Sequence, residues 1–363
     1  MKVFISTVPF GQLDRRPFDL MDNSGIDFVV NPLGRKLKED DLLELIKDID
    51  VLIAGTEPLT ASVLSQVHKL RLIVRVGIGL DSVDLLAAKE QGIAVSYTPD
   101  APSAAVSELT ISLMLNLLRS VHLSNQELHR GQWQRHLGRR LEDCTIGIIG
   151  AGRIGARVIR HLSGFGCRKV LVNDIVKSME PIGDVPWEWQ DKNTIYREAD
   201  VISIHVPLTN LTRDMISREE LQMMKPDAVL INTARGGIVN ETALFEMLRN
   251  GSLSGAAVDT FENEPYSGPL AELEQCILTA HIGSMTEDCR ARMEIEATRE
   301  AIRFLTGQPL IQEVPDEEYE NQRLAVAHRV GITGERSCYW WVRSQRVPVP
   351  GRPVMRRVGR GPR

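Results

Sequence analysis

The sequence has 363 residues, of which 43% are hydrophobic and 25% charged, enough apolar material for one large core or two ordinary ones. Its five cysteines are scattered, odd in number and without a Cys-x-x-Cys pair. That usage argues against a disulfide framework and a zinc site and is typical of a reducing cytoplasm, so we expect no metal. With a formal net charge of −5, the body is acidic, which argues against nucleic-acid binding.

Short apolar runs alternate with helix-period stretches from the start of the chain. The strands expected in the first hundred residues are 2–6, 27–31, 51–55, 70–77 and 93–98, with helices at 38–48 and 60–68. The first run stops before Pro9, so it is predicted to be a strand and not a signal peptide. No apolar run approaches the ~20 residues that cross a bilayer. We therefore expect a soluble, cytoplasmic protein without membrane contact.

The same alternation resumes after a long apolar-striped helix at 102–119 and a polar stretch at 124–143. The further strands expected are 145–150, 169–174, 200–207, 227–234, 255–261 and 276–283, with helices at 153–163, 217–224 and 240–249. Because alternating strands and helices form parallel βαβ units, we predict an α/β fold of two Rossmann-like doubly wound parallel-sheet domains. The simplest division places them at 1–100 and 101–285. A last helix at 287–306 could belong to either.

The periodicity fades in the segment 313–363. This tail begins with an acidic stretch, and from Gln322 it holds ten arginines, no lysine and one acid. Such a composition predicts disorder. The tail is either a dispensable extension, a coding-frame artefact, or a segment that contacts RNA or an acidic surface through 323–363.

The run "TIGIIGAGRIGARVIRHL" carries the GxGxxG pattern at Gly150, Gly152 and Gly155, between a buried-strand pattern and a helix that opens at Arg153 and Ile154. These glycines allow a tight turn, a close approach of a pyrophosphate and close helix–strand packing, and the helix N-terminus favours phosphate. The next strand ends in Asp174, nineteen residues after Gly155. A carboxylate there binds a ribose diol and repels a 2′-phosphate. The pattern therefore predicts NAD, with NADP less favoured.

Polar side chains follow three more predicted strands. They are Arg235, the acids Asp259 and Glu264, and His281. Open parallel sheets bind ligands at the carboxyl ends of their strands. An arginine suits a carboxylate or a polarised carbonyl, and a histidine held by a carboxylate can exchange a proton with a carbonyl oxygen. Each residue alone has an ordinary structural interpretation, but together at the edge of an NAD-type sheet they predict an active site.

Several stretches of the chain resemble the D-isomer-specific 2-hydroxyacid dehydrogenase family, which includes D-3-phosphoglycerate dehydrogenases. They are "VGIGLDSVDL" (76–85), "GIIGAGRIG" (147–155), "HVPLT" (205–209), "LINTARGGIVNETAL" (230–244), "DTFENEP" (259–265) and "HIGSMTED" (281–288). The resemblance covers about residues 1–312.

The resemblance implies a role for each matching residue. Arg235 would bind the substrate carboxyl and carbonyl, with Glu264 as partner of His281, the acid/base. The implied cofactor-binding residues are Gly150, Gly152, Arg153, Ile154, Gly155, Asp174, His205, Pro207, Thr233, Ala234, Asp259 and Gly283, of which Asp259 would lie near the nicotinamide carboxamide. The implied substrate-binding residues are Arg235 and the backbone N–H groups of Val76, Gly77 and Gly79.

In this family the last helix returns to the first domain. The resemblance thus implies a flavodoxin-like substrate domain of 1–100 plus 287–312 with an inserted NAD-binding domain at 101–286. It also implies a homodimer through 102–140.

The departures from the family pattern bear on the substrate. Ala54 stands where phosphoglycerate-specific members often have a basic or hydroxyl residue, which leaves Arg75 as a candidate for a substrate phosphate or as a surface cation.

We expect an NAD-dependent enzyme acting on a small D-2-hydroxy or 2-keto acid of the phosphoglycerate, hydroxypyruvate or glyoxylate type. The alternatives are oxidation of a one-carbon or inorganic acid and an NAD(H)-sensing, corepressor-like module without significant turnover.

Overall fold

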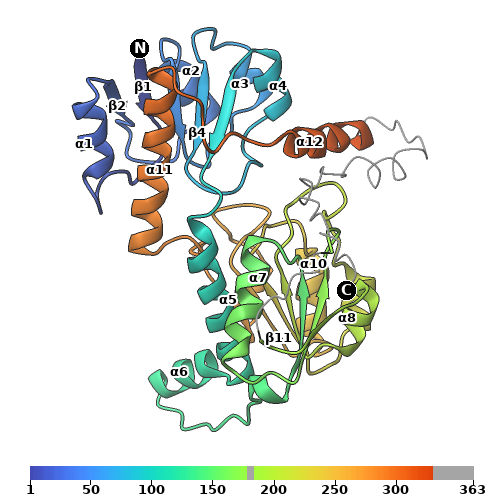
Figure 1. Ribbon diagram of the computed structural model, residues 1–363. Coiled ribbons are helices and arrows are strands. Elements are labelled where there is room, and N and C mark those ends of the chain that lie inside the picture. The colour runs from blue at the N-terminus through green and yellow to red at the C-terminus, as the bar shows by residue number, and fades with distance from the viewer. Residues whose placement is uncertain (178–183, 330–363) are drawn as a thin grey trace, which may run out of the picture.

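The computed structural model describes residues 1–177 and 184–329, which form two α/β domains joined by a long helix (Figure 1). Each domain has one all-parallel sheet, of five strands in the first and seven in the second. This confirms the predicted fold class of two doubly wound parallel-sheet domains. Among the described residues, no single helix has the length and apolar composition needed to cross a membrane, although the bent pair α5 (Pro102–Leu118) and α6 (Val121–His129) meets that test when taken together.

The sheet of the first domain has the strand order β2-β1-β3-β4-β5, which is the flavodoxin-like order. Its strands are β1 (Lys2–Ile5), β2 (Asp27–Val30), β3 (Val51–Ala54), β4 (Leu72–Arg75) and β5 (Ala94–Tyr97). Its helices are α1 (Arg16–Asn23), α2 (Glu39–Leu45), α3 (Ala61–Leu64) and α4 (Leu85–Glu90). Strand β3 is apolar throughout, and β1 and β4 each hold three consecutive buried apolar residues, because helices cover both faces of the sheet.

The long helix α11 (Glu287–Leu305) packs on the sheet of the first domain (Figure 1). Cys289, Met293 and Ala297 on its buried face join a hydrophobic cluster with side chains of β1, β3 and β4. The chain therefore leaves the first domain after β5 and returns to it through α11.

The sheet of the second domain has the order β12-β11-β10-β9-β6-β7-β8. The strand order runs outward from β6 on both sides, so the topological switch point lies between β6 and β9. Its strands are β6 (Thr145–Ile149), β7 (Lys169–Asn173), β8 (Trp187–Trp189), β9 (Val201–Ile204), β10 (Val229–Asn232), β11 (Gly255–Val258) and β12 (Cys276–Leu278). Its helices are α5 (Pro102–Leu118), α6 (Val121–His129), α7 (Arg153–Ser163), α8 (Lys192–Glu198), α9 (Arg218–Met223) and α10 (Glu241–Arg249). Such a switch point is where doubly wound sheets bind dinucleotides.

One prediction about an irregular segment is wrong, because part of the tail predicted to be disordered forms helix α12 (Asp316–Arg329). The polar stretch at 124–143 begins inside helix α6. Three acids in the first turn of α12 favour its N-terminus, and Gln322 accepts a hydrogen bond from the N–H of Leu85 at 2.8 Å and donates one to Val83 O at 2.7 Å. These contacts with α4 are non-local, so periodicity could not show them. The rest of the tail lies outside the described residues.

Candidate active site

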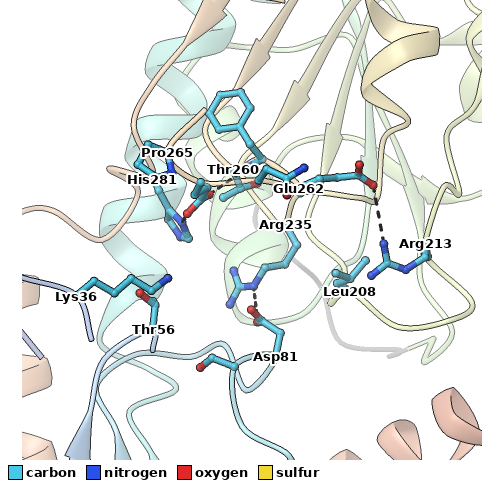
Figure 2. A pocket seen from close by; sticks show the side chains of 15 residues that line it. Lys36, Thr56, Asp81, Leu208, Arg213, Arg235, Thr260, Glu262, Pro265 and His281 are labelled. Carbon is cyan, nitrogen blue, oxygen red and sulfur yellow. Dashed lines mark hydrogen bonds and ion pairs between the residues drawn. The ribbon is translucent and has the colours of Figure 1, made fainter. Parts of the chain in front are cut away.

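A cavity of about 420 Å³ lies between the two domains, at the carboxyl ends of the strands (Figure 2). Its walls combine the loops after β10, β11 and β12 with loops of the first domain. The lining residues are Lys36, Thr56, Asp81, Ser82, Leu208, Arg213, Arg235, Gly236, Thr260, Phe261, Glu262, Asn263, Glu264, Pro265 and His281. The cavity therefore brings together Arg235, Glu264 and His281, the three residues that the sequence predicts to be catalytic.

Glu264 and His281 form a hydrogen-bonded pair across two loops. Both carboxylate oxygens lie 3.0 Å from Nδ1 of the histidine, and Oε1 also accepts the N–H of Phe261 at 3.1 Å. Burial raises the pKa of the Glu264 carboxyl, but the hydrogen bond and positive charge of His281 outweigh it and hold that pKa below its usual value. The pairing places the proton on Nδ1 and leaves Nε2 as the other reactive nitrogen of the ring.

Asp259 holds the loop that carries this histidine. Its buried carboxylate accepts the Thr279 hydroxyl at 2.6 Å and the N–H groups of Ile282 and Gly283 at 2.8 and 2.9 Å, and its main-chain oxygen accepts the N–H of His281. His281 has a φ of 52°, a left-handed conformation that costs a non-glycine residue free energy. The bonds to Asp259 offset that cost. A Cβ on Gly283 would lie 3.1 Å from the same carboxylate, so the residue must be small.

Arg235 follows β10 and reaches across to the first domain. Its Nε donates to Asp81 Oδ1 at 2.9 Å (Figure 2). Its Nη1 donates to Ala234 O at 2.7 Å. Gly79 fits closely beneath the guanidinium, because a Cβ there would lie 1.9 Å from Nη2. The guanidinium is thus held in one place between the domains, with Nη2 beside the loop that the resemblance assigns to the substrate carboxylate.

That loop offers fewer donors than expected. The N–H of Val76 donates to Ala54 O at 2.8 Å, and the N–H of Gly77 donates to Thr98 Oγ1 at 2.7 Å. Both N–H groups are therefore engaged within the first domain in this structure, and their contact with a substrate carboxylate stays a prediction. The N–H of Gly79 has no acceptor within the described part of the chain.

Arg75 is buried beneath the same loop, so the interpretation of it as a surface cation is wrong. Its Nη1 donates to Val76 O, and burial lowers its pKa to about 10. The buried side chain of Arg75 does not line the cavity.

The glycine-rich loop after β6 has the geometry that a dinucleotide requires. Gly150 has a φ of 99°, and a Cβ on Gly155 would lie 1.9 Å from the oxygen of Gly150, so α7 and β6 pack closely. A Cβ on Gly152 would meet nothing within 4 Å, which leaves open space at the N-terminus of α7. Asp174 Oδ2 accepts the N–H of Ala151 at 2.6 Å and thus sits at the edge of this space. The residues present fit the pyrophosphate and ribose of NAD.

The remaining predicted cofactor residues make contacts within the protein. Arg153 donates to Asp100 at 2.7 Å, and Ile154 packs on the core of the domain. Thr233 shares a hydrogen bond with Thr110 at 2.9 Å, and Pro207 O accepts the Thr212 hydroxyl.

His205 follows β9 directly, and its half-buried ring has a buried Nδ1. Burial lowers its pKa to about 3. Its Nε2 lies 2.9 Å from Ser203 Oγ, while Nδ1 is buried without a partner among the described residues.

Sequence reasoning gave no role to most residues of the cavity wall, among them three that the first domain contributes. Asp81 lies inside a matched stretch but received no role, and Lys36 and Thr56 lie in loops without any motif. Only the folded chain places them opposite His281. No group of three or more potential metal-binding side chains occurs within residues 1–177 and 184–329.

Comparison with known proteins identifies this arrangement. The family described as "D-isomer specific 2-hydroxyacid dehydrogenase, NAD binding domain" matches residues 111–283. The hydroxypyruvate reductase of Thermotoga maritima is 37% identical over 276 residues, 74% of this chain and 89% of that protein. The D-3-phosphoglycerate dehydrogenase of Methanocaldococcus jannaschii is 40% identical over 266 residues, 70% of this chain, although the match spans only 49% of that longer protein.

Solved structures give the same answer. The TT0316 protein of Thermus thermophilus superposes with a TM-score of 0.79 at 32% identity, covering 87% of this chain and all of that one. The D-lactate dehydrogenase of Aquifex aeolicus, solved with NAD and lactic acid, has a TM-score of 0.75 at 27% identity, covering 85% of this chain and 96% of that one. The chain belongs to the D-isomer-specific 2-hydroxyacid dehydrogenase family of NAD-dependent oxidoreductases.

Proposed function

We propose that this protein interconverts a small D-2-hydroxy acid and the corresponding 2-keto acid, with His281 as acid/base. The observation that carries the proposal is the convergence of the Glu264–His281 pair and Arg235 on one cavity between the domains. The glycine-rich loop and Asp174 follow strands β6 and β7. These strands belong to the same sheet as β10, β11 and β12, which precede the three catalytic residues. Glyoxylate, hydroxypyruvate and phosphohydroxypyruvate are the candidate substrates, by analogy with the named relatives.

The protein's part in the reaction is binding, orientation and proton transfer. Bound NAD supplies the hydride acceptor or donor. Arg235 binds the substrate carboxylate and polarises the reacting carbonyl, helped by the N–H of Gly79. Glu264 fixes the ring of His281 and stabilises its charged form, so that Nε2 gives a proton to the carbonyl oxygen during reduction and accepts it during oxidation. Asp259 positions the histidine through its loop.

The domain division that we propose is 1–100 plus 287–312 for the substrate domain and 101–286 for the NAD-binding domain. The packing of α11 on the first sheet supports it, as does the family match at 111–283.

We also propose a homodimer through α5, α6 and the arm that follows. Large apolar side chains stand exposed there, with Trp133 78% and Leu137 fully accessible.

The test of the enzymatic proposal is NADH and NADPH oxidation with a panel of 2-keto acids. We expect turnover of at least one keto acid with NADH, and its loss in His281→Ala while NADH still binds. Tight NADH binding with no turnover of any keto or hydroxy acid would refute the proposal.

A further inference from the structure

The wall of the cavity that the first domain supplies carries one cation, Lys36. It lies in the loop between β2 and α2, opposite Arg235 and His281. In Figure 2 its side chain extends toward the His281 side of the cavity, with Thr56 beside its end. The amine therefore faces the cavity from the domain opposite the reacting groups.

The loop that carries Lys36 is held by charge-assisted bonds. Arg35 makes a two-pronged pair with Asp41, with Nη–Oδ distances of 2.7 and 2.9 Å, and Asp41 also accepts the N–H of Lys38. The hydrogen bond to Arg35 lowers the pKa of Asp41 to about 2. The Asn31 side chain bridges Ser6 O and Arg35 O from beneath. The position of Lys36 is thus fixed by neighbours that do not use its own amine.

Lys36 differs from the other cations of the wall in having no partner for its amine in the described part of the chain. Arg235 is paired with Asp81, and Arg213 lies 3.8 Å from Glu262. No hydrogen bond or ion pair of the Lys36 amine occurs within residues 1–177 and 184–323. An ammonium aimed into a cavity without an acceptor is available to a ligand.

We propose that Lys36, with the Thr56 hydroxyl beside it, forms a subsite for a second anionic group at the far end of the substrate. This inference rests on the proposed function and narrows it to 2-keto and 2-hydroxy acids that carry a distal carboxylate or phosphate. Arg235 takes the first carboxylate, and Lys36 lies across the cavity from it. Arg75 cannot fill this role because it is buried and bonded to Val76 O.

The size of the cavity agrees with this assignment. A volume of about 420 Å³ lies within the range of small-molecule sites and exceeds what a two-carbon keto acid fills. Lys36 also contributes to the low pKa of the Glu264 carboxyl, so a purely electrostatic effect on the catalytic pair is the competing explanation.

The test compares Lys36→Met, which keeps the aliphatic stem, with the wild type. The substrates are phosphohydroxypyruvate and oxaloacetate, which carry a distal phosphate or carboxylate, and hydroxypyruvate and glyoxylate, which do not. We expect kcat/KM for the substrates with a distal anion to fall by about 10-fold or more, mainly through KM, and to change less than about 2-fold for the others. The distal group that loses more identifies the anion. Lys36→Arg should retain most of the preference.

The matched control is Lys38→Met, which removes the same charge from the same loop but not from the cavity wall. It should leave all four values unchanged. Equal losses on every substrate in Lys36→Met would refute the subsite and favour the electrostatic explanation. If the wild type turns over hydroxypyruvate and its kcat/KM is no higher for the substrates with a distal anion, this inference alone is overturned. Absence of turnover with every substrate would overturn the proposed function together with it.

Discussion

Nδ1 of His281 lies 3.0 Å from both carboxylate oxygens of Glu264. A ring held in this way at Nδ1 has one tautomer and one orientation, which leaves Nε2 available for proton exchange in the cavity. The backbone adds a second constraint, because His281 stays at a φ of 52° only while Asp259 holds the following loop. Orientation of the histidine therefore depends on two carboxylates with different tasks, one for the ring and one for the backbone.

Replacing Glu264 by glutamine tests the first task. The amide keeps the size of the side chain but loses the charge that stabilises the protonated histidine and fixes its tautomer. We expect kcat to fall by about 100-fold or more with little change in KM for NADH. Steady-state kinetics with the best keto acid measure this. Glu262→Gln is the control, since Glu262 contacts Arg213 and not the histidine. An unchanged kcat in Glu264→Gln would remove Glu264 from the proposed mechanism.

The same carboxyl should make folding stability depend on pH. Its pKa is lowered in the folded protein, so the native state binds this proton more weakly than the unfolded chain does. The resulting stabilisation is present above the unfolded pKa and is lost as the pH falls through the lowered folded value. Denaturant unfolding between about pH 6 and pH 3 should therefore show wild type losing stability faster than Glu264→Gln. Parallel curves would contradict this. The side chain is partly exposed, so the difference should be small.

The ion pair between Arg235 and Asp81 predicts a defect in substrate binding. Asp81→Asn keeps an acceptor for Nε but weakens the hold on the guanidinium, which should raise KM for the keto acid by about 10-fold and leave KM for NADH unchanged. Arg235→Lys should lose much more, because an ammonium cannot bind a carboxylate with two parallel bonds. A rise in KM for NADH would show that Asp81 acts through domain placement instead.

The sequence was sufficient where local pattern and chemistry agree. Apolar runs, the spacing of Gly150 to Gly155, and the polar residues after β10, β11 and β12 predict both sheets and the catalytic set, because parallel strands align their carboxyl ends. It failed where a residue's role depends on contacts between segments distant in the sequence. Nothing in the loop near Lys36 indicates that it faces His281, and only folding shows that the N–H groups of Val76 and Gly77 are engaged.

Cofactor choice should depend on the charge of Asp174. The Asp174→Asn variant retains an oxygen that can accept the N–H of Ala151, but it no longer repels a 2′-phosphate. We expect the ratio of kcat/KM for NADH to that for NADPH to fall by about 10-fold, mostly through a gain with NADPH. Initial rates with both cofactors at saturating keto acid provide the measurement. If the ratio does not move, the selectivity arises elsewhere in the cleft.

Alanine substitutions at three glycines of the cofactor loop and its helix distinguish effects on stability from effects on cofactor binding. A Cβ on Gly155 would lie 1.9 Å from the oxygen of Gly150, so Gly155→Ala must push α7 away from β6. We expect it to lower the free energy of unfolding by about 1–3 kcal/mol. Gly164→Ala, at the other end of α7, is the control, since its Cβ would have an ordinary contact of 3.6 Å.

Gly152→Ala should behave in the opposite way to Gly155→Ala. Its Cβ would meet no protein atom within 4 Å and its φ of −70° suits alanine, so stability should change by less than about 0.5 kcal/mol. The new methyl group would stand where the pyrophosphate approaches the N-terminus of α7, and the Kd for NADH should rise by about 10-fold or more. Fluorescence titration of NADH and denaturant unfolding of the same samples measure both quantities. An unchanged NADH affinity in Gly152→Ala would mean that the pyrophosphate does not lie against this loop, because a methyl group at its binding position would have weakened binding.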